Sequence, residues 1–267
     1  MRFLCLHGMG TNSKVGIPKW LQFLESMEHR KAPGLTTSAI RHGLGHQHTY
    51  EFIDGAVPAP MAPGIEPLSI HVRHINMSEL SLMDGIDEGL DAIAGPNDEF
   101  LQYVDYTSTE SCLKALYDLE KHVEEEGPYD GIISFSLGAT LAASFMVHKL
   151  RKNQRKELLQ PTFRCAVFFC GGLPEEMSAD GTNRRVLSFE QDGELIQFPT
   201  AHVWGANDQM YPEFGTVLSK LCLKDSRAVF VHPGGHEIPG PKDEQSLQET
   251  IRVIKQTIER AEEKHRE

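Results

Sequence analysis

One stretch, residues 127–140, constrains the fold of this chain more than any other. The apolar segment Gly131 to Phe135 leads directly to Ser136 and then to an alanine-rich segment of helical character. This layout is typical of a nucleophile elbow, a tight strand-to-helix turn that lifts a serine hydroxyl above the carboxyl end of a parallel sheet. The usual G-x-S-x-G pattern reads Ser134-x-Ser136-x-Gly138 here, with one small residue replacing another. The alternative is that Ser136 merely caps an ordinary helix.

Further apolar runs with the character of buried strands alternate with segments of helical periodicity. The predicted strands are 2–6, 50–55, 131–135, 163–169, 198–204 and 228–231, and the predicted helices are 39–44, 108–126, 137–149 and 243–264. This alternation predicts an α/β fold, with a mainly parallel sheet that carries helices on both faces. In such sheets the chemistry collects at the carboxyl ends of the strands.

Two further strand ends carry residues that complement a serine nucleophile. Asp208 follows the strand 198–204, and His236 follows the last strand, so the chain order is Ser136, Asp208, His236. That order is the one expected of an α/β-hydrolase triad. A histidine near its ordinary pKa can take the proton of a serine hydroxyl, and an aspartate can hold the imidazole in the required tautomer. We therefore predict acyl transfer with these three residues in the catalytic roles.

Other residues compete for two of these roles. His232 lies four positions before His236, but Gly234-Gly235 gives His236 the turn that a catalytic base needs. Asp180 and Asp192 are alternatives to Asp208, yet both fall in the polar segment 174–195, without a strand before them. His236 and Asp208 are therefore favoured.

The first predicted strand ends in a glycine-flanked turn, His7-Gly8-Met9-Gly10. Backbone N–H groups in such a loop can bind an oxyanion. We predict that the N–H of Met9 and the N–H of Leu137, directly after Ser136, form an oxyanion hole. The glycine-rich signatures of phosphate-binding loops are absent from the sequence.

Composition excludes several other classes of protein. The net charge of −12 argues against a nucleic-acid partner, and no apolar window is long enough for a membrane span. Five scattered cysteines without a CxxC pair indicate a reducing, cytoplasmic location and no structural zinc. The pair His46 and His48 lacks neighbouring ligands, so no metal site and no cofactor are predicted. Cys170 is expected to be a buried structural thiol, and the basic cluster 149–156 a solvated helix end.

We expect residues 1–267 to form a single α/β-hydrolase domain. The segment 56–106 contains four prolines between Val57 and Pro67 as well as several aromatic residues, and it is predicted to be an irregular lid over the substrate pocket. The block 15–38 reads as extra sequence, either a genuine insertion or a translated intron in the gene model.

Several stretches together resemble the family of serine hydrolases, a branch of the α/β-hydrolases, and within it the fungal esterases and thioesterases found beside polyketide biosynthesis. The matching stretches are 3–12, 50–55, 127–138, 205–208 and 232–239. Ser134 departs from the usual glycine, and Leu137 from a frequent glutamine.

The resemblance implies a Ser136, Asp208, His236 triad that acts without a cofactor on a small-molecule acyl ester or thioester. It also suggests product release or trimming in polyketide biosynthesis, with a synthase carrier domain as partner. The alternatives are a general carboxylesterase or acyl-protein thioesterase, and a non-catalytic ligand-binding protein on the same fold.

Overall fold

The centre of the molecule is a twisted parallel sheet. The computed structural model of the chain describes residues 1–12, 38–62, 66–67, 93–94, 99–178, 180 and 182–265. The described residues form a six-stranded sheet with the order β12-β11-β8-β7-β1-β2, in which every neighbouring pair is parallel. Its strands are β1 (Arg2–Leu6), β2 (Thr49–Ile53), β7 (Gly131–Phe135), β8 (Cys165–Phe169), β11 (Thr200–Gly205) and β12 (Arg227–His232). The predicted mainly parallel sheet is thus confirmed.

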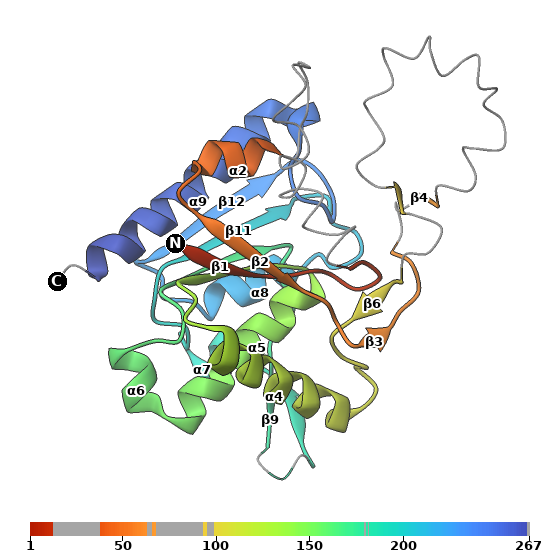
Figure 1. Cartoon of the computed structure of the whole chain (residues 1–267), viewed down its shortest axis with the longest axis vertical. Coiled ribbons are helices and arrows are strands. Elements are labelled where there is room, and N and C mark those ends of the chain that lie inside the picture. Colours follow the sequence, from red (N-terminus) through yellow and green to blue (C-terminus); the bar gives the residue numbers. More distant parts are fainter. Residues whose placement is uncertain are drawn as a thin grey trace.

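Helices cover both faces of this sheet, as Figure 1 shows, with α2 and α9 on one side and α4 and α5 on the other. The described helices are α2 (Ser38–Leu44), α4 (Thr109–Glu126), α5 (Leu137–Lys152), α6 (Gln154–Leu159), α7 (Phe189–Asp192), α8 (Phe214–Lys220), α9 (Glu244–Lys264) and the 3-10 turn η3 (Pro241–Asp243). Strand β1 serves both layers, because alternate side chains of a strand point to opposite faces. Phe3 packs in the core beneath α2 and α9, and Leu4 in the core beneath α4 and α5.

The two long surface helices begin at side-chain caps. The Oγ of Ser108 accepts a hydrogen bond from the N–H of Ser111 at 3.2 Å, at the start of α4. The carboxylate of Asp243 does the same for the N–H of Ser246 at 3.0 Å, at the start of α9. Each such cap contributes about 1 kcal/mol. The predicted apolar face of α9 is buried on the sheet, and it includes Leu247, Ile251, Ile254 and Ile258.

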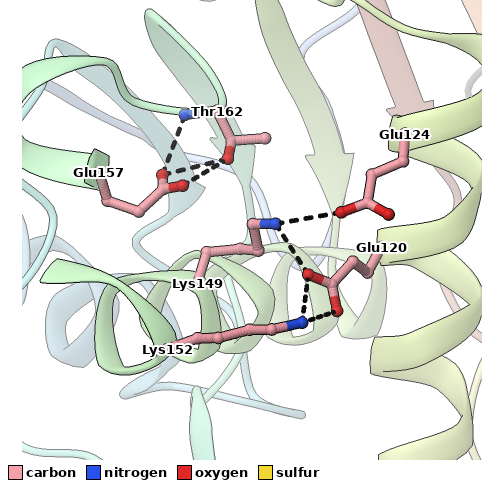
Figure 2. A network of polar contacts seen from close by, with 6 residues as sticks. All are labelled: Glu120, Glu124, Lys149, Lys152, Glu157 and Thr162. Atoms are coloured by element: carbon pink, nitrogen blue, oxygen red, sulfur yellow. Dashed lines mark hydrogen bonds and ion pairs between the residues drawn. The ribbon is translucent and has the colours of Figure 1, made fainter.

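The basic cluster at the end of α5 is a solvated helix end except at Lys149, for which this prediction was wrong. Lys149 and Lys152 bind the carboxylate of Glu120 on α4, at 2.8 and 2.9 Å (Figure 2). The side chains of Glu120 and Lys149 are only 8% and 12% exposed. Burial acts to raise the pKa of Glu120, but the hydrogen bonds and charges of the two lysines outweigh it and lower that pKa. The network fixes α4 against α5.

Short strands accompany the main sheet. They pair β3 (Val57–Pro58) with β6 (Leu101–Gln102), β4 (Glu66–Pro67) with β5 (Ile93–Ala94), and β9 (Glu175–Met177) with β10 (Arg184–Val186). The segment 57–67 was predicted to contain no regular structure, and β3 and β4 correct that prediction. Proline has no backbone N–H group to donate to a neighbouring strand. It is tolerated in β3 and β4 because strands this short need few such donors. Most of the proposed lid and of the block 15–38 lies outside the described residues.

Candidate active site

Ser136 lies at the turn between β7 and α5, with φ 54° and ψ −121°. Its N–H donates to the carbonyl oxygen of Phe169 at 2.9 Å, which ties the turn to the end of β8. A Cβ added to Gly138 would lie 2.3 Å from the carbonyl oxygen of His7, so only glycine lets α5 start this close to β1. Ser134 is fully buried, and its hydroxyl donates to the carbonyl of Val167 at 3.4 Å. Serine is therefore accommodated at this position.

The turns after β11 and β12 are joined by backbone hydrogen bonds. The N–H of Asn207 donates to the carbonyl of Gly234 at 3.0 Å, and the side-chain amide of Asn207 donates to the carbonyl of Pro233 at 2.6 Å. A Cβ on Gly205 would lie 2.1 Å from the carbonyl oxygen of Gly235. This close approach brings the loop of Asp208 against the loop of His236.

The structure brings Ser136, Asp208 and His236 together. The Oγ of Ser136 lies 2.8 Å from Nε2 of His236, and Nδ1 of His236 lies 2.6 Å from Oδ2 of Asp208. The other oxygen of Asp208 accepts hydrogen bonds from the N–H groups of Met210 and Tyr211 at 3.0 and 2.9 Å. Since an ionised carboxylate only accepts, Nδ1 of His236 carries a proton and Nε2 is free to accept one.

Two aromatic rings pack against the His236 imidazole, and the sequence analysis did not single them out. The ring of Tyr211 lies 4.9 Å from it and the ring of Phe135 lies 5.3 Å from it, measured between centroids. The two rings restrict the orientations that the imidazole can adopt. Their places in the sequence could have identified them, because Phe135 directly precedes Ser136 and Tyr211 lies three residues after Asp208.

The His7 loop lies beside the elbow. A Cβ built on Gly8 would approach the Cβ of Ser136 to 3.4 Å. Among the residues that the structure describes, no acceptor is bound to the N–H of Met9 or of Leu137. Neither of the two predicted donors is therefore occupied within the described residues.

The imidazole of His7 holds this loop, a role that the motif alone did not reveal. Its Nδ1–H donates to the carbonyl of Gly8 at 2.6 Å, and its Nε2 accepts from the N–H of Gly55 at 3.0 Å. Burial lowers the pKa of His7, in keeping with this neutral form. The hydroxyl of Tyr103 accepts from the N–H of His7 at 3.0 Å and donates to the carbonyl of Ile53 at 2.8 Å. Three segments of the chain thus meet at His7.

The competing residues have other contacts. Nε2 of His232 donates to the carbonyl of Glu237 at 3.2 Å, and Nδ1 accepts from the N–H of Gly234 at 3.1 Å, so His232 shapes the loop that carries His236. Asp180 binds Ser178 and Thr182 within the β9–β10 hairpin. Asp192 binds Arg185 and Ser188 next to that hairpin. None of the three contacts Ser136 in the described part of the chain.

Cys170, at the end of β8, is buried as predicted. It has φ 45°, and its thiol donates to the carbonyl of Glu237 at 3.3 Å. Burial, followed by the charge of Asp208, raises the pKa of the Cys170 thiol to about 12. A protonated thiol is a weak nucleophile, so this cysteine does not compete with Ser136 for that role.

Comparisons with known proteins show the family of the chain. The model of the serine hydrolase (FSH1) family matches residues 1–248. The chain belongs to this family. It is 34% identical to the esterase FPY3 of Fusarium mangiferae over 98% of both chains, and 29% identical to the hydrolase phiM of Fungal sp. over 89% of this chain and 86% of that protein. Among solved structures, the match to a carboxylesterase from Mesorhizobium loti has 15% sequence identity and a TM-score of 0.47. It covers 96% of this chain and 87% of the carboxylesterase chain.

As a member of the serine hydrolase family with relatives named esterases, the chain is a hydrolytic enzyme with an α/β-hydrolase fold. None of the helices in the described ranges has the length and apolarity needed to cross a bilayer.

Proposed function

We propose that the protein hydrolyses acyl esters or thioesters through an acyl-enzyme on Ser136. The observation that carries this proposal is the unbroken chain of contacts from Ser136 Oγ to His236 at 2.8 Å, and from His236 to Asp208 at 2.6 Å. A serine hydroxyl needs such a base to become nucleophilic at neutral pH. Asp208 is buried and held by two backbone N–H groups, so it stabilises the imidazolium that forms.

In the proposed reaction, Ser136 Oγ attacks the carbonyl carbon while its proton moves to Nε2 of His236. The N–H groups of Met9 and Leu137 bind the resulting oxyanion, and each such donor is worth about two to three powers of ten in rate. The tetrahedral intermediate expels the alcohol or thiol, which takes the proton from His236. Water then attacks the acyl-enzyme by the same route and releases the acid.

Hydrolysis of p-nitrophenyl acyl esters by matched serine variants tests this proposal. Ser136→Ala removes the nucleophile and is expected to abolish turnover. Ser134→Ala is the control, because Ser134 is equally buried, lies two residues away and donates only to a backbone carbonyl. Substantial turnover by Ser136→Ala, in a preparation free of other hydrolases, would refute the proposal.

We further propose that the substrate is a product of polyketide biosynthesis, released or trimmed by this enzyme, with a synthase carrier domain as partner. The support is the resemblance of the chain to fungal esterases and thioesterases found beside such pathways. Comparing kcat/KM for a free acyl thioester and for the same acyl group on a carrier domain tests it. A preference for the carrier-bound form supports the proposal, and equal rates argue for a general carboxylesterase.

We propose a cytoplasmic location for the enzyme. All five cysteines are buried and free, an arrangement that is usual in a reducing compartment. Microscopy of the tagged full-length chain tests this location.

A further inference from the structure

Cys170 lies beside two residues of the proposed triad, Asp208 and His236. It follows β8, Asp208 follows β11 and His236 follows β12, and these three strands are neighbours in the sheet. One ligand atom from each of the three residues lies within 4.8 Å of the others. In the part of the chain covered by the structure, no other group of three such side chains meets this condition.

We propose that Cys170, Asp208 and His236 form a binding site for a thiophilic divalent cation, Zn²⁺ or Cd²⁺, and that the bound ion switches the enzyme off. Thiolate, imidazole and carboxylate are the ligand types of zinc sites, with bonds of about 2.0–2.3 Å that leave the ligand atoms roughly 3.5 Å apart around the ion. Atoms within 4.8 Å of each other therefore need to move by only about an ångström, which side-chain rotation provides.

The thiol of Cys170 is buried. It donates one hydrogen bond, to the carbonyl of Glu237 at 3.3 Å, and this bond exchanges for the bond to the metal. The imidazole of His236 is the most exposed of the groups, with 13% of its side chain accessible against 4% for Asp208. The ion therefore enters along the His236 side, where the substrate also approaches Ser136.

The proton balance explains why a bound ion would stop catalysis. The thiol proton of Cys170 leaves to solvent as the sulfur–metal bond forms, since a coordinating thiol is deprotonated. The metal takes the place of the proton on Nδ1 of His236, and the neutral imidazole then carries its proton on Nε2. Nε2, which lies 2.8 Å from Ser136 Oγ, becomes a donor and cannot take the serine proton.

The inhibition rests on the proposed function of the triad, whereas the binding of the ion does not. The site should also discriminate between cations. A thiolate ligand selects soft metals over Mg²⁺, which prefers oxygen ligands. Cys112 offers a matched comparison, because it is a buried free cysteine whose neighbour is the guanidinium of Arg184 at 3.4 Å, a contact that disfavours a cation.

Cadmium binding measures the site without reference to activity. The full-length protein is titrated with Cd²⁺ while the thiolate-to-cadmium absorption is followed in the ultraviolet. We expect one Cd²⁺ per chain for the wild type and for Cys112→Ala, and loss of the band in Cys170→Ala and Cys170→Ser. The serine variant retains a donor for Glu237, so it separates lost ligation from a disturbed loop. A full band in either Cys170 variant overturns the proposal.

Zinc inhibition of p-nitrophenyl ester hydrolysis measures the consequence. We expect Zn²⁺ to inhibit reversibly on addition of a chelator, Mg²⁺ to have no effect, and the half-inhibitory Zn²⁺ concentration to rise in Cys170→Ser. The rise should exceed about tenfold, because loss of even an outer partner of a metal ligand costs about 10–100-fold in affinity. Equal half-inhibitory Zn²⁺ concentrations for the wild type and Cys170→Ser would overturn the proposal that an ion bound at Cys170 switches the enzyme off. If no variant hydrolyses any ester, the proposed function fails, and the cadmium titration still decides the site.

Discussion

Replacement of Asp208 by asparagine is the most informative single change to the proposed triad. The wild type and Asp208→Asn differ by one charge and by the replacement of one carboxylate oxygen with an NH₂ group. In the wild type, one carboxylate oxygen accepts from the N–H groups of Met210 and Tyr211, and the other accepts from His236. An asparagine must direct its single oxygen to the two backbone donors, because its NH₂ group cannot accept hydrogen bonds.

The NH₂ group of the asparagine then faces Nδ1 of His236 at the position of the present 2.6 Å contact. Nδ1 can only accept from it, so the imidazole proton moves to Nε2 and the ring can no longer deprotonate Ser136. A forced wrong tautomer of this kind costs about four powers of ten in kcat, equivalent to about 5 kcal/mol of transition-state stabilisation. KM should change little, because Asp208 is buried and acts through His236.

Steady-state kinetics with a p-nitrophenyl ester measures this effect, and near-ultraviolet circular dichroism checks that the variant is folded. Asp180→Asn is the matched control, since Asp180 is exposed in the β9–β10 hairpin and binds only neighbouring residues. Its activity should stay within about twofold of wild type. Retention of more than a tenth of the wild-type kcat by Asp208→Asn would refute the reasoning.

Four further substitutions test the packing of the fold and of the site. Glu120→Ala removes the 2.8 Å ion pair of the half-buried Lys149 and leaves it only Glu124 at 3.6 Å, so urea denaturation should show a loss of about 2 kcal/mol in unfolding free energy. Lys152→Ala, whose side chain is 56% exposed, should cost much less. Burial lowers the pKa of His202 to about 3, so only the unfolded state binds a proton at this imidazole as the pH falls below about 6.5. The wild type therefore loses unfolding free energy between pH 7 and 5. His202→Gln should lose about 2 kcal/mol less unfolding free energy over the same range. Gly205→Ala places a Cβ 2.1 Å from the carbonyl of Gly235, so kcat should fall with little change in KM.

The elbow was predictable because local sterics dictate its residues. Gly138 must be small because α5 starts against the carbonyl of His7, and the apolar run before Ser136 is a strand that is buried from Gly131 to Ser134. The candidate acid and base were predictable because parallel strands place their following turns at one edge of the sheet.

Short helices escaped prediction. α6 and α8 contain 6 and 7 residues, too few for a periodic apolar pattern to emerge. The burial of Lys149 was also missed, because its partner Glu120 lies on another helix, 29 positions earlier in the sequence. The supporting role of His7 depends on Gly55 and Tyr103, which only the fold brings near it. Contacts between distant segments leave no local pattern in the sequence.

Labelling with a fluorophosphonate probe tests most directly the claim that Ser136 is an activated nucleophile. The probe reacts only with a serine whose hydroxyl is deprotonated by a neighbouring base, and mass spectrometry of the digested protein locates the adduct. The account predicts one adduct, on the peptide that contains Ser136, present in Ser134→Ala and absent from Ser136→Ala. An adduct on another residue, or undiminished labelling of Ser136→Ala, would contradict it.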